Sequence, residues 1–134
     1  MKKELFKNEI TILRDTFRRL LRRHAETNIL KLIDKTHPAD LALLFRYFND
    51  SEQDEIFSKL LPCEKTAEFL NDLDESIGVR LLENESTERI ASILEHASSN
   101  EQAYLIGLVD QKYTSSVIEL LQTDKQEELK EMMA

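Results

Sequence analysis

His37-Pro38-Ala39-Asp40-Leu41-Ala42-Leu43-Leu44-Phe45 opens a pattern of two short amphipathic helices that recurs about every 24 residues along the chain. The first helices of the units share one apolar pattern, which runs through Ala42-Leu43-Leu44-Phe45 with Phe48, Ala67-Glu68-Phe69-Leu70 with Leu73, Ala91-Ser92-Ile93-Leu94 with Ala97 and, more faintly, Ser115-Ser116-Val117-Ile118 with Leu121. Units this short cannot bury their apolar faces alone, so we expect them to stack into one continuous core.

The second helices repeat as well, with apolar residues near their ends. They carry Ile56-Phe57 with Leu60-Leu61, Ile77 with Leu81-Leu82, Tyr104-Leu105 with Leu108-Val109, and Leu129 with Met132-Met133. No segment alternates between apolar and polar residues over the length of a strand, so an all-α fold is predicted. We expect a basic helical region over residues 1–36 and a helical-repeat domain over residues 37–134.

Helix-start signals support these boundaries. Pro38 and Pro62 suit the first position of a helix, where the missing N–H is no loss. His37 precedes Pro38 and is expected to cap the free N–H groups of that helix. Capping boxes are predicted at the starts of second helices from the pairs Ser51 with Asp54, Ser99 with Gln102, and Thr123 with Gln126.

Composition limits the class of protein. The chain has 134 residues, 41% of them hydrophobic, with 2 Gly and 2 Pro, which is enough for one core with short loops. The single cysteine, Cys63, cannot form an internal disulfide, and we expect it to fill space in the core of an intracellular protein. No apolar run is long enough to span a membrane and no export signal is visible, so a soluble polypeptide is expected.

Charge is distributed unevenly. Residues 1–38 hold 10 Lys and Arg against 5 Asp and Glu, whereas residues 39–134 hold 8 against 21. The first segment is predicted to be one long amphipathic helix with Leu5, Phe6, Ile10, Leu13, Phe17, Leu20 and Leu21 on its apolar face. One possibility is that the apolar side of this helix caps the solenoid while its arginines stay solvated or pair with the chain's own acidic repeats. The other is that a cluster of Arg18, Arg19, Arg22 and Arg23 contacts anionic lipid or an acidic partner.

The sequence lacks the common signatures of catalysis and of nucleic-acid binding. The sequence has no glycine-rich phosphate loop, nucleophile elbow or His-Glu-x-x-His motif, and His24, His37 and His96 are far apart. The basic residues lie on one helix without aromatic stacking residues, which disfavours nucleic-acid binding. We expect neither an enzyme nor a nucleic-acid-binding protein.

At this point a resemblance becomes visible. The motifs that carry it are His37-Pro38-Ala39-Asp40-Leu41-Ala42, Leu60-Leu61-Pro62, Thr66-Ala67-Glu68-Phe69-Leu70-Asn71-Asp72-Leu73 and Arg89-Ile90-Ala91-Ser92-Ile93-Leu94. From about residue 26 to the end, the chain resembles the N-terminal cytosolic domain of MgtE magnesium transporters. Residues 125–134 are similar to the helix that leads into the paired CBS domains of that family, so the polypeptide would be a fragment or a free-standing version of a larger membrane protein.

The resemblance implies a right-handed, armadillo-like superhelix on the cytoplasmic side of the bacterial inner membrane. It implies that the domain packs on CBS domains, with Mg²⁺ ions bridging acidic residues, and helps to gate the transmembrane domain in response to cytosolic Mg²⁺. A homodimer through the full-length protein is also implied. The family places metal-facing residues at the positions of Glu68, Asn100 and Glu101.

One departure from the family pattern affects this metal interface. Family members commonly show Asp-Asp-x-x-Asp where this chain has Asn100-Glu101-Gln102-Ala103-Tyr104. Tyr104 cannot replace the third carboxylate at neutral pH. We therefore expect Mg²⁺ binding by the isolated domain to be weak, with half of each site missing.

A second resemblance leads to a different class of function. His37-Pro38 followed by a hydrophobic helix, with a second helix ending in Leu60-Leu61-Pro62, is also similar to the armadillo-like units of the flagellar motor-switch protein FliG. That family commonly shows Glu-His-Pro-Gln, whereas Thr36 and Ala39 flank the pair here. This reading implies a scaffold that binds proteins and has no metal role.

Overall fold

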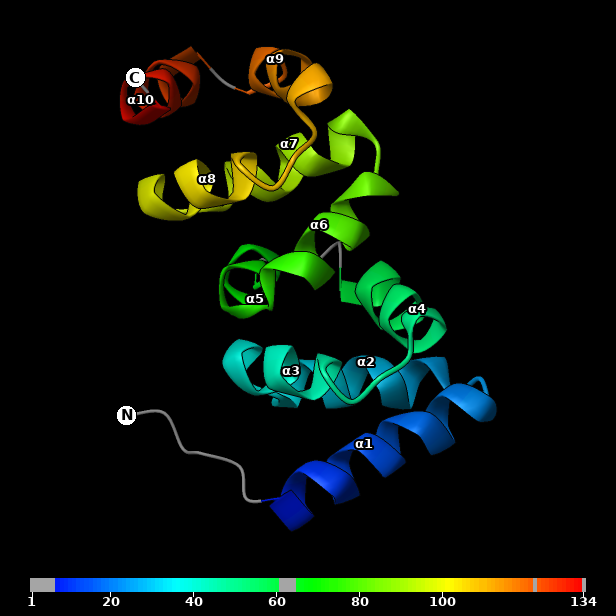
Figure 1. Cartoon of the computed structure of the whole chain (residues 1–134). Helices are drawn as coiled ribbons and strands as arrows, with labels where there is room; N and C mark the ends of the chain where they lie inside the picture. The colour runs from blue at the N-terminus through cyan, green and yellow to red at the C-terminus, as the bar shows by residue number, and fades with distance from the viewer. Residues whose placement is uncertain (1–6, 61–64, 122, 134) are drawn as a thin grey trace.

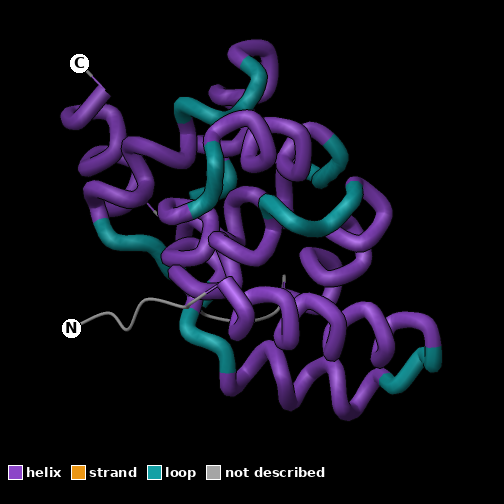
Figure 2. The backbone as a smooth tube through the Cα atoms, turned by 60° about the horizontal axis from the view of Figure 1, so that its bottom comes forward, coloured by secondary structure: helices purple, strands orange, loops and turns teal. Residues whose placement is uncertain are grey.

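Short helices stack one above another from the N-terminal to the C-terminal end of the chain (Figure 1). The computed structural model describes residues 7–60, 65–121 and 123–133. Within them no strand occurs, and short loops join the helices (Figure 2). The helices of this part are α1 Lys7–Arg22, α2 Glu26–Lys35, α3 Pro38–Phe45, α4 Asp50–Leu60, α5 Thr66–Asp72, α6 Glu75–Glu83, α7 Thr87–Glu95, α8 Ser99–Ile106, α9 Gln111–Glu119 and α10 Thr123–Met133. The predicted all-α solenoid is confirmed.

The apolar pattern of the repeat forms the core as predicted. Buried side chains recur at the expected first-helix positions of every unit, namely Ala42, Leu44, Phe45 and Phe48, then Ala67, Phe69, Leu70 and Leu73, then Ala91, Ile93, Leu94 and Ala97, then Val117, Ile118 and Leu121. Helix α3 packs on α5, α5 on α7 and α8, and α7 on α9. The units therefore share one core that runs along the stack.

The N-terminal region differs from the single long helix that we predicted. His24 has a φ of 53°, and the chain turns there into α2. The N–H of His24 donates to the carbonyl of Leu21 and the N–H of Ala25 to that of Leu20, at 3.1 Å each. This pairing satisfies the last carbonyls of α1 and is the usual helix ending with a left-handed residue. Glycine normally takes that position, so a histidine there does not signal a helix end.

The apolar face predicted for this region is nevertheless correct. Phe17 and Leu21 are buried, and Ile10, Leu13 and Leu20 pack against the core. Ring contacts continue the core from α1 into the repeats, because the Phe17 ring meets the Phe48 ring edge to face at 5.8 Å between centroids. Leu5 and Phe6 lie outside the described residues, as do Pro62 and Cys63. The boundary between residues 36 and 37 stays a prediction.

Two of the three predicted capping boxes are displaced, by two residues at α4 and by one residue at α8. At α4 the side chain of Asn49 accepts from the N–H of Glu52 at 2.8 Å, and the Glu52 carboxylate accepts from the N–H of Asn49 at 2.9 Å. At α8 the pair is Ser98 with Glu101. Each box begins before the serine that we selected, Ser51 or Ser99, because the preceding Asn or Ser already satisfies the first N–H groups. The Thr123 side chain of the third predicted box lies outside the described part.

Gln102, assigned above to a capping box, instead lies in the core. Its Nε2 donates to the carbonyls of Leu94 at 2.8 Å and Ala97 at 3.4 Å. In the first unit, Nε2 of Gln53 makes the corresponding bonds to the carbonyls of Phe45 and Phe48. A buried amide thus holds the end of a first helix against its second helix at corresponding places in two units.

Candidate functional site

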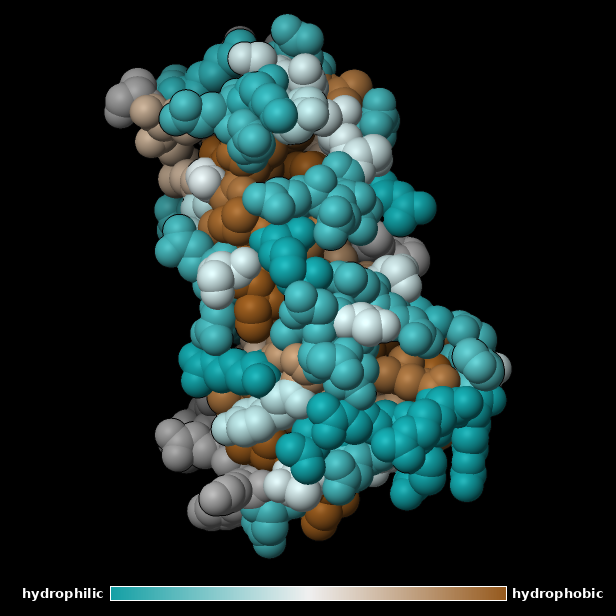
Figure 3. Space-filling model, turned by 45° about the vertical axis from the view of Figure 1, so that its right-hand side comes forward, coloured by the Kyte–Doolittle hydropathy of each residue, from teal (hydrophilic) through white to brown (hydrophobic). Residues whose placement is uncertain are grey.

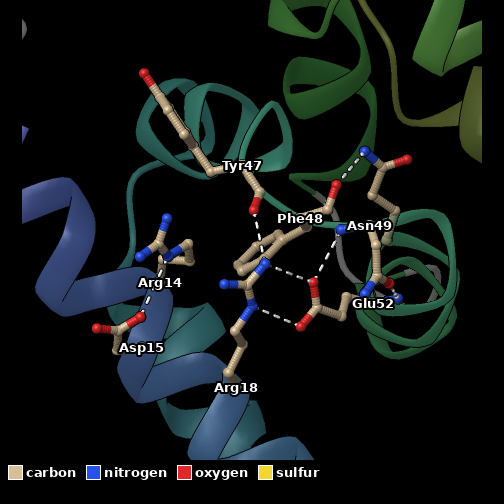
Figure 4. A network of polar contacts seen from close by, with 8 residues as sticks. Arg14, Asp15, Arg18, Tyr47, Phe48, Asn49 and Glu52 are labelled. Carbon is tan, nitrogen blue, oxygen red and sulfur yellow. Dashed lines mark hydrogen bonds and ion pairs between the residues drawn. The ribbon is translucent and has the colours of Figure 1, made fainter.

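The predicted arginine cluster divides into one bound and three exposed side chains. Arg18 crosses from α1 to the first repeat, where its Nε lies 2.7 Å from Oε2 of Glu52 and its Nη2 3.1 Å from Oε1 (Figure 4). The same Nη2 donates to the carbonyl of Tyr47 at 3.0 Å. Such a bidentate pair fixes orientation as well as adding energy. Arg18 therefore anchors α1 to the repeats.

Glu52 is the acceptor at the centre of this network. Burial raises the pKa of Glu52, but the hydrogen bonds from Arg18 and from the backbone of Asn49, with the charges of Arg18 and Arg22, bring it below the ordinary value. The hydrogen bond to Glu52 likewise raises the pKa of Arg18. Glu52 thus stays ionised at neutral pH while it caps α4 and binds α1.

The other three arginines, Arg19, Arg22 and Arg23, are exposed at the end of α1. Within the described part of the chain none of the three forms an ion pair, although the charge of Arg22 contributes to the lowered pKa of Glu52. Helix α1 itself lies at one end of the stack (Figure 1). This surface can attract an anionic partner, and the contact with lipid or protein stays a prediction.

The predicted metal ligands lie on two helices that pack together, α5 and α8. Glu68 is exposed in the first turn of α5, and Asn100 is exposed near the start of α8. Glu101 is half-buried, and its Oε1 accepts from the N–H of Ser98 at 2.9 Å as part of the capping box. One of its carboxylate oxygens is therefore already used by the fold.

Tyr104 stands where the family pattern has a third carboxylate. Burial and the charge of Glu75 raise the pKa of the Tyr104 hydroxyl above its ordinary value. The phenol is thus neutral at physiological pH, as the sequence led us to expect, and cannot act as an anionic ligand. Among the described residues no three His, Cys, Asp or Glu side chains gather into a metal-binding group.

These donors can still contribute to a Mg²⁺ site that a second surface completes. Mg²⁺ binds oxygen ligands, keeps several waters and commonly uses one or two carboxylates of a protein. The exposed Glu68 carboxylate and Asn100 amide suit that chemistry, and Glu101 can offer its remaining oxygen. The donor types of these residues suit Mg²⁺, and a Mg²⁺ site at this position stays a prediction.

The histidines serve at helix ends. Nδ1 of His37 accepts from the N–H of Ala39 at 3.1 Å, which confirms the predicted cap of α3. His24 makes the turn after α1, and Nδ1 of His96 lies 3.0 Å from the carbonyl of Ser92 at the end of α7. His37 and His96 thus contribute side-chain hydrogen bonds to helix ends, and His24 contributes its backbone conformation.

Sequence reasoning missed a groove between the α6–α7 junction and the start of α9. Its volume is about 460 Å³. Apolar lining comes from Leu82, Ile90 and Val109, and carboxylates come from Glu83, Glu85 and Asp110. The residues are distant in the sequence and meet only through the register of the stack, so no local motif signals the groove. Figure 3 shows hydrophobic atoms exposed between hydrophilic ridges on one face of the molecule.

No helix of the described residues is both long enough and apolar enough to cross a membrane. No curated protein matches the chain in a sequence search. Among solved structures, one described as "Crystal structure of the soluble part of a magnesium transporter" shares 13% sequence identity with a TM-score of 0.78. The match covers 92% of this chain and 49% of that one, so this chain spans about half the length of the matched chain and the likeness shows the fold.

A comparison with protein families decides between the two resemblances. The family description "MgtE intracellular N domain" matches residues 36–134, which is most of the chain and includes every repeat unit. The match supports the transporter resemblance and not the motor-switch one. The chain belongs to the MgtE intracellular N domain family.

Proposed function

We propose that this chain is the regulatory domain of an MgtE-type magnesium transporter and acts on the cytoplasmic side of the bacterial plasma membrane. The observation that carries the proposal is the family match over residues 36–134. The fold shared with the soluble part of a magnesium transporter supports it. The role is regulatory, and the proposal assigns no catalytic residue.

In the proposed mechanism the domain packs on CBS domains of the same transporter and helps to close the transmembrane pore when cytosolic Mg²⁺ is high. Mg²⁺ would bridge Glu68, Asn100 and Glu101 to carboxylates of the opposing surface. Without the ion these carboxylates repel the acidic partner, which favours separation. The full-length protein would act as a homodimer, and the arginines at the end of α1 would face anionic lipid or an acidic neighbour.

The energetics require several ions acting together. Moving a two-state equilibrium from 1:99 to 99:1 takes about 5.5 kcal/mol of differential binding. An exposed charge pair contributes only about 0–1 kcal/mol, so one bridged pair is insufficient. The exposed positions of Glu68 and Asn100 agree with weak half-sites that gain affinity from the second surface.

The proposal is tested by deleting this segment from the full-length protein that its gene encodes. The full-length product is placed in vesicles, and Mg²⁺ flux is measured as internal Mg²⁺ is raised. We expect flux to fall with internal Mg²⁺ and this inhibition to be lost when residues 1–134 are removed. A full-length product that transports no Mg²⁺, or whose inhibition survives the deletion, would overturn the proposal.

Matched substitutions test the assigned ligands. Glu68→Gln is expected to raise the Mg²⁺ concentration of half-inhibition at least about threefold, because one charged ligand is lost at each site. Asp34→Asn serves as the control, since Asp34 is also exposed but lies at the end of α2. Equal effects of the two substitutions would show that Glu68 has no metal role.

A further inference from the structure

One glutamine recurs at equivalent positions of the second helices. Gln53, Gln102 and Gln126 each lie five residues after the last apolar residue of the first-helix pattern. Each donates from Nε2 to a carbonyl at the end of that first helix. The units can therefore be aligned on this amide, and in the second unit Gly78 takes its position.

The oxygen of this amide has a partner in the first unit. Oε1 of Gln53 accepts from Nη2 of Arg80, on α6, at 2.6 Å. The same guanidinium donates from Nη1 to Oδ1 of Asp54 at 2.8 Å. Arg80 thus joins the second helix of one unit to the second helix of the unit before, through charge-assisted hydrogen bonds.

The oxygen of Gln102 has no such partner. Gln102 is 1% exposed, and within the described part of the chain its Oε1 is a buried oxygen that accepts no hydrogen bond. The two carbonyls bound by its other end, Nε2, fix which end of the amide is the oxygen. A buried acceptor without a donor has lost its hydration and gained no bond in exchange, so packing is unfavourable at this point.

Helix α10 holds, relative to α8, the place that α6 holds relative to α4, and α8 and α10 pack together. Arg80 follows Gly78 by two positions, and the residue two positions after Gln126 is Glu128. An ionised carboxylate has no hydrogen to donate. The sequence therefore has no donor at the position where the first pair of units has Arg80.

Tyr104 supports this register. It holds on α8 the place that Arg80 holds on α6, two positions after the aligned amide position. The charge of Glu75 acts on the Tyr104 hydroxyl. In the same way, Nε of Arg80 lies 3.8 Å from Oδ1 of Asp50, the residue that corresponds to Glu75. The register between α6 and α8 is thus the same as that between α4 and α6.

Helix α10 is also held by little apolar burial. Among its described side chains Leu129 is buried, whereas Met132 and Met133 are 40% and 49% exposed. The apolar side chains that α4 buries are Ile56, Phe57 and Leu60. Separation of α10 from α8 therefore exposes little apolar surface, and it allows water to reach the Gln102 oxygen.

We propose that α10 is a latch at the C-terminal end of the stack, which opens from α8 without unfolding of the other repeats and which a hydrogen-bond donor to Gln102 closes. Gln126 binds the carbonyl of Glu119 at the end of α9, so the start of α10 is the pivot. Elements with few buried contacts are the ones that open locally. The proposal goes beyond the Mg²⁺-dependent function and does not depend on it.

Separate opening of α10 is tested by hydrogen exchange of the whole chain, followed by NMR in buffer with EDTA and low concentrations of urea. We expect exchange in residues 129–132 to depend less on urea than exchange in residues 54–60, because opening of α10 exposes less surface than unfolding of the repeats. The same urea dependence in both groups would show that α10 opens only with the whole stack, and would overturn the proposal.

Supply of a donor tests the role of Gln102. Glu128→Arg places a guanidinium at the position that corresponds to Arg80, and we expect it to slow exchange in residues 129–132 at least about fivefold. Glu131→Arg makes the same change of charge at an exposed position of the same helix and should alter these rates less than about twofold. Equal slowing by the two variants would contradict the assigned role.

The Gln102 side chain gives a readout that general stabilisation of a terminal helix does not move. A hydrogen bond accepted by Oε1 shifts the Cδ signal of the amide downfield, and we expect this shift for Gln102 in Glu128→Arg but not in Glu131→Arg. Arg80→Met is the reference, because it should move the Gln53 signal upfield. A Gln102 signal that stays in place in Glu128→Arg would overturn the proposal. These results leave the Mg²⁺-dependent function untouched, because no Mg²⁺ is present.

Discussion

Glu52 holds two parts of the structure with one carboxylate. It caps α4 through the N–H of Asn49 and accepts two hydrogen bonds from Arg18 of α1. Its side chain is 17% exposed, so solvent screens the pair less than a surface pair. Removing the charge affects the cap and the α1 contact at once.

The pH dependence of stability follows from the lowered pKa of Glu52. A carboxyl whose folded-state pKa lies below its ordinary value of 4.5 contributes stability above that pH, and this contribution is lost as the pH falls through the folded-state pKa. We expect Glu52→Gln to lower the free energy of unfolding by about 1–2 kcal/mol at pH 6. Urea unfolding from pH 6 to 3 should show the difference shrinking below pH 4.5, and a constant difference would contradict this account.

The charge of Glu85 is predicted to destabilise the fold at neutral pH, whereas the charge of Glu52 stabilises it. Its pKa is raised by burial and by Asp54, against the lowering effect of Arg89. Ionisation therefore costs stability at neutral pH, and the cost disappears as the pH falls through the folded-state pKa. Glu85→Gln is expected to raise the free energy of unfolding at pH 7 by on the order of 0.5 kcal/mol. A loss of stability at pH 7 in urea unfolding would show that the charge is well compensated.

The N-cap residue determines where a helix begins. Ser98, the N-cap of α8, and Ser99, its first residue, allow the contribution of the cap to stability to be measured. Ser98 accepts from the N–H of Glu101 at 3.2 Å, whereas Ser99 is the first residue of α8. Ser98→Ala is expected to cost about 1 kcal/mol of stability, within the usual range for a lost cap. Ser99→Ala should change stability by less than about 0.5 kcal/mol. Thermal unfolding of both variants distinguishes them, and equal effects would contradict the assignment.

Sequence reasoning succeeds for these elements where the signal is periodic and fails where it is local and degenerate. The buried positions of α3, α5, α7 and α9 recur in every unit, so several copies support each assignment. The turn at His24 has a single copy, and a histidine there carries no recognisable stop signal. The adjacent serines at 98 and 99 look alike in sequence, and only the backbone shows which one is the cap.

At the scale of the whole molecule, α1 belongs to the shared core. Phe17 is fully buried and meets Phe48 across the predicted boundary between residues 36 and 37. Phe17→Ala is expected to cost about 3–5 kcal/mol of stability. Ile12 of the same helix is 65% exposed, so Ile12→Ala should cost less than about 0.5 kcal/mol. A single urea transition with a much lower midpoint for Phe17→Ala is predicted. An unchanged midpoint would mean that α1 is not part of the cooperative unit.

The candidate sites were predictable to different extents. The resemblance points to Glu68, Asn100 and Glu101, whose metal role stays a prediction. The use of Glu101 in a capping box depends on where α8 begins. Arg18 was grouped with its neighbours because periodicity cannot show that Glu52 lies opposite it. The groove at Glu85 requires the spatial register of α6, α7 and α9, which sequence spacing alone does not provide.

We propose above that Mg²⁺ joins this domain to CBS domains. The decisive measurement is the affinity of the chain for the CBS-domain pair of the proposed full-length transporter, determined by calorimetry as a function of Mg²⁺ concentration. We predict that affinity rises at least about tenfold from EDTA to millimolar Mg²⁺, that Glu68→Gln reduces this gain, and that Asp34→Asn does not. Affinity that is independent of Mg²⁺, or saturation of the isolated chain at submillimolar Mg²⁺, would contradict the account.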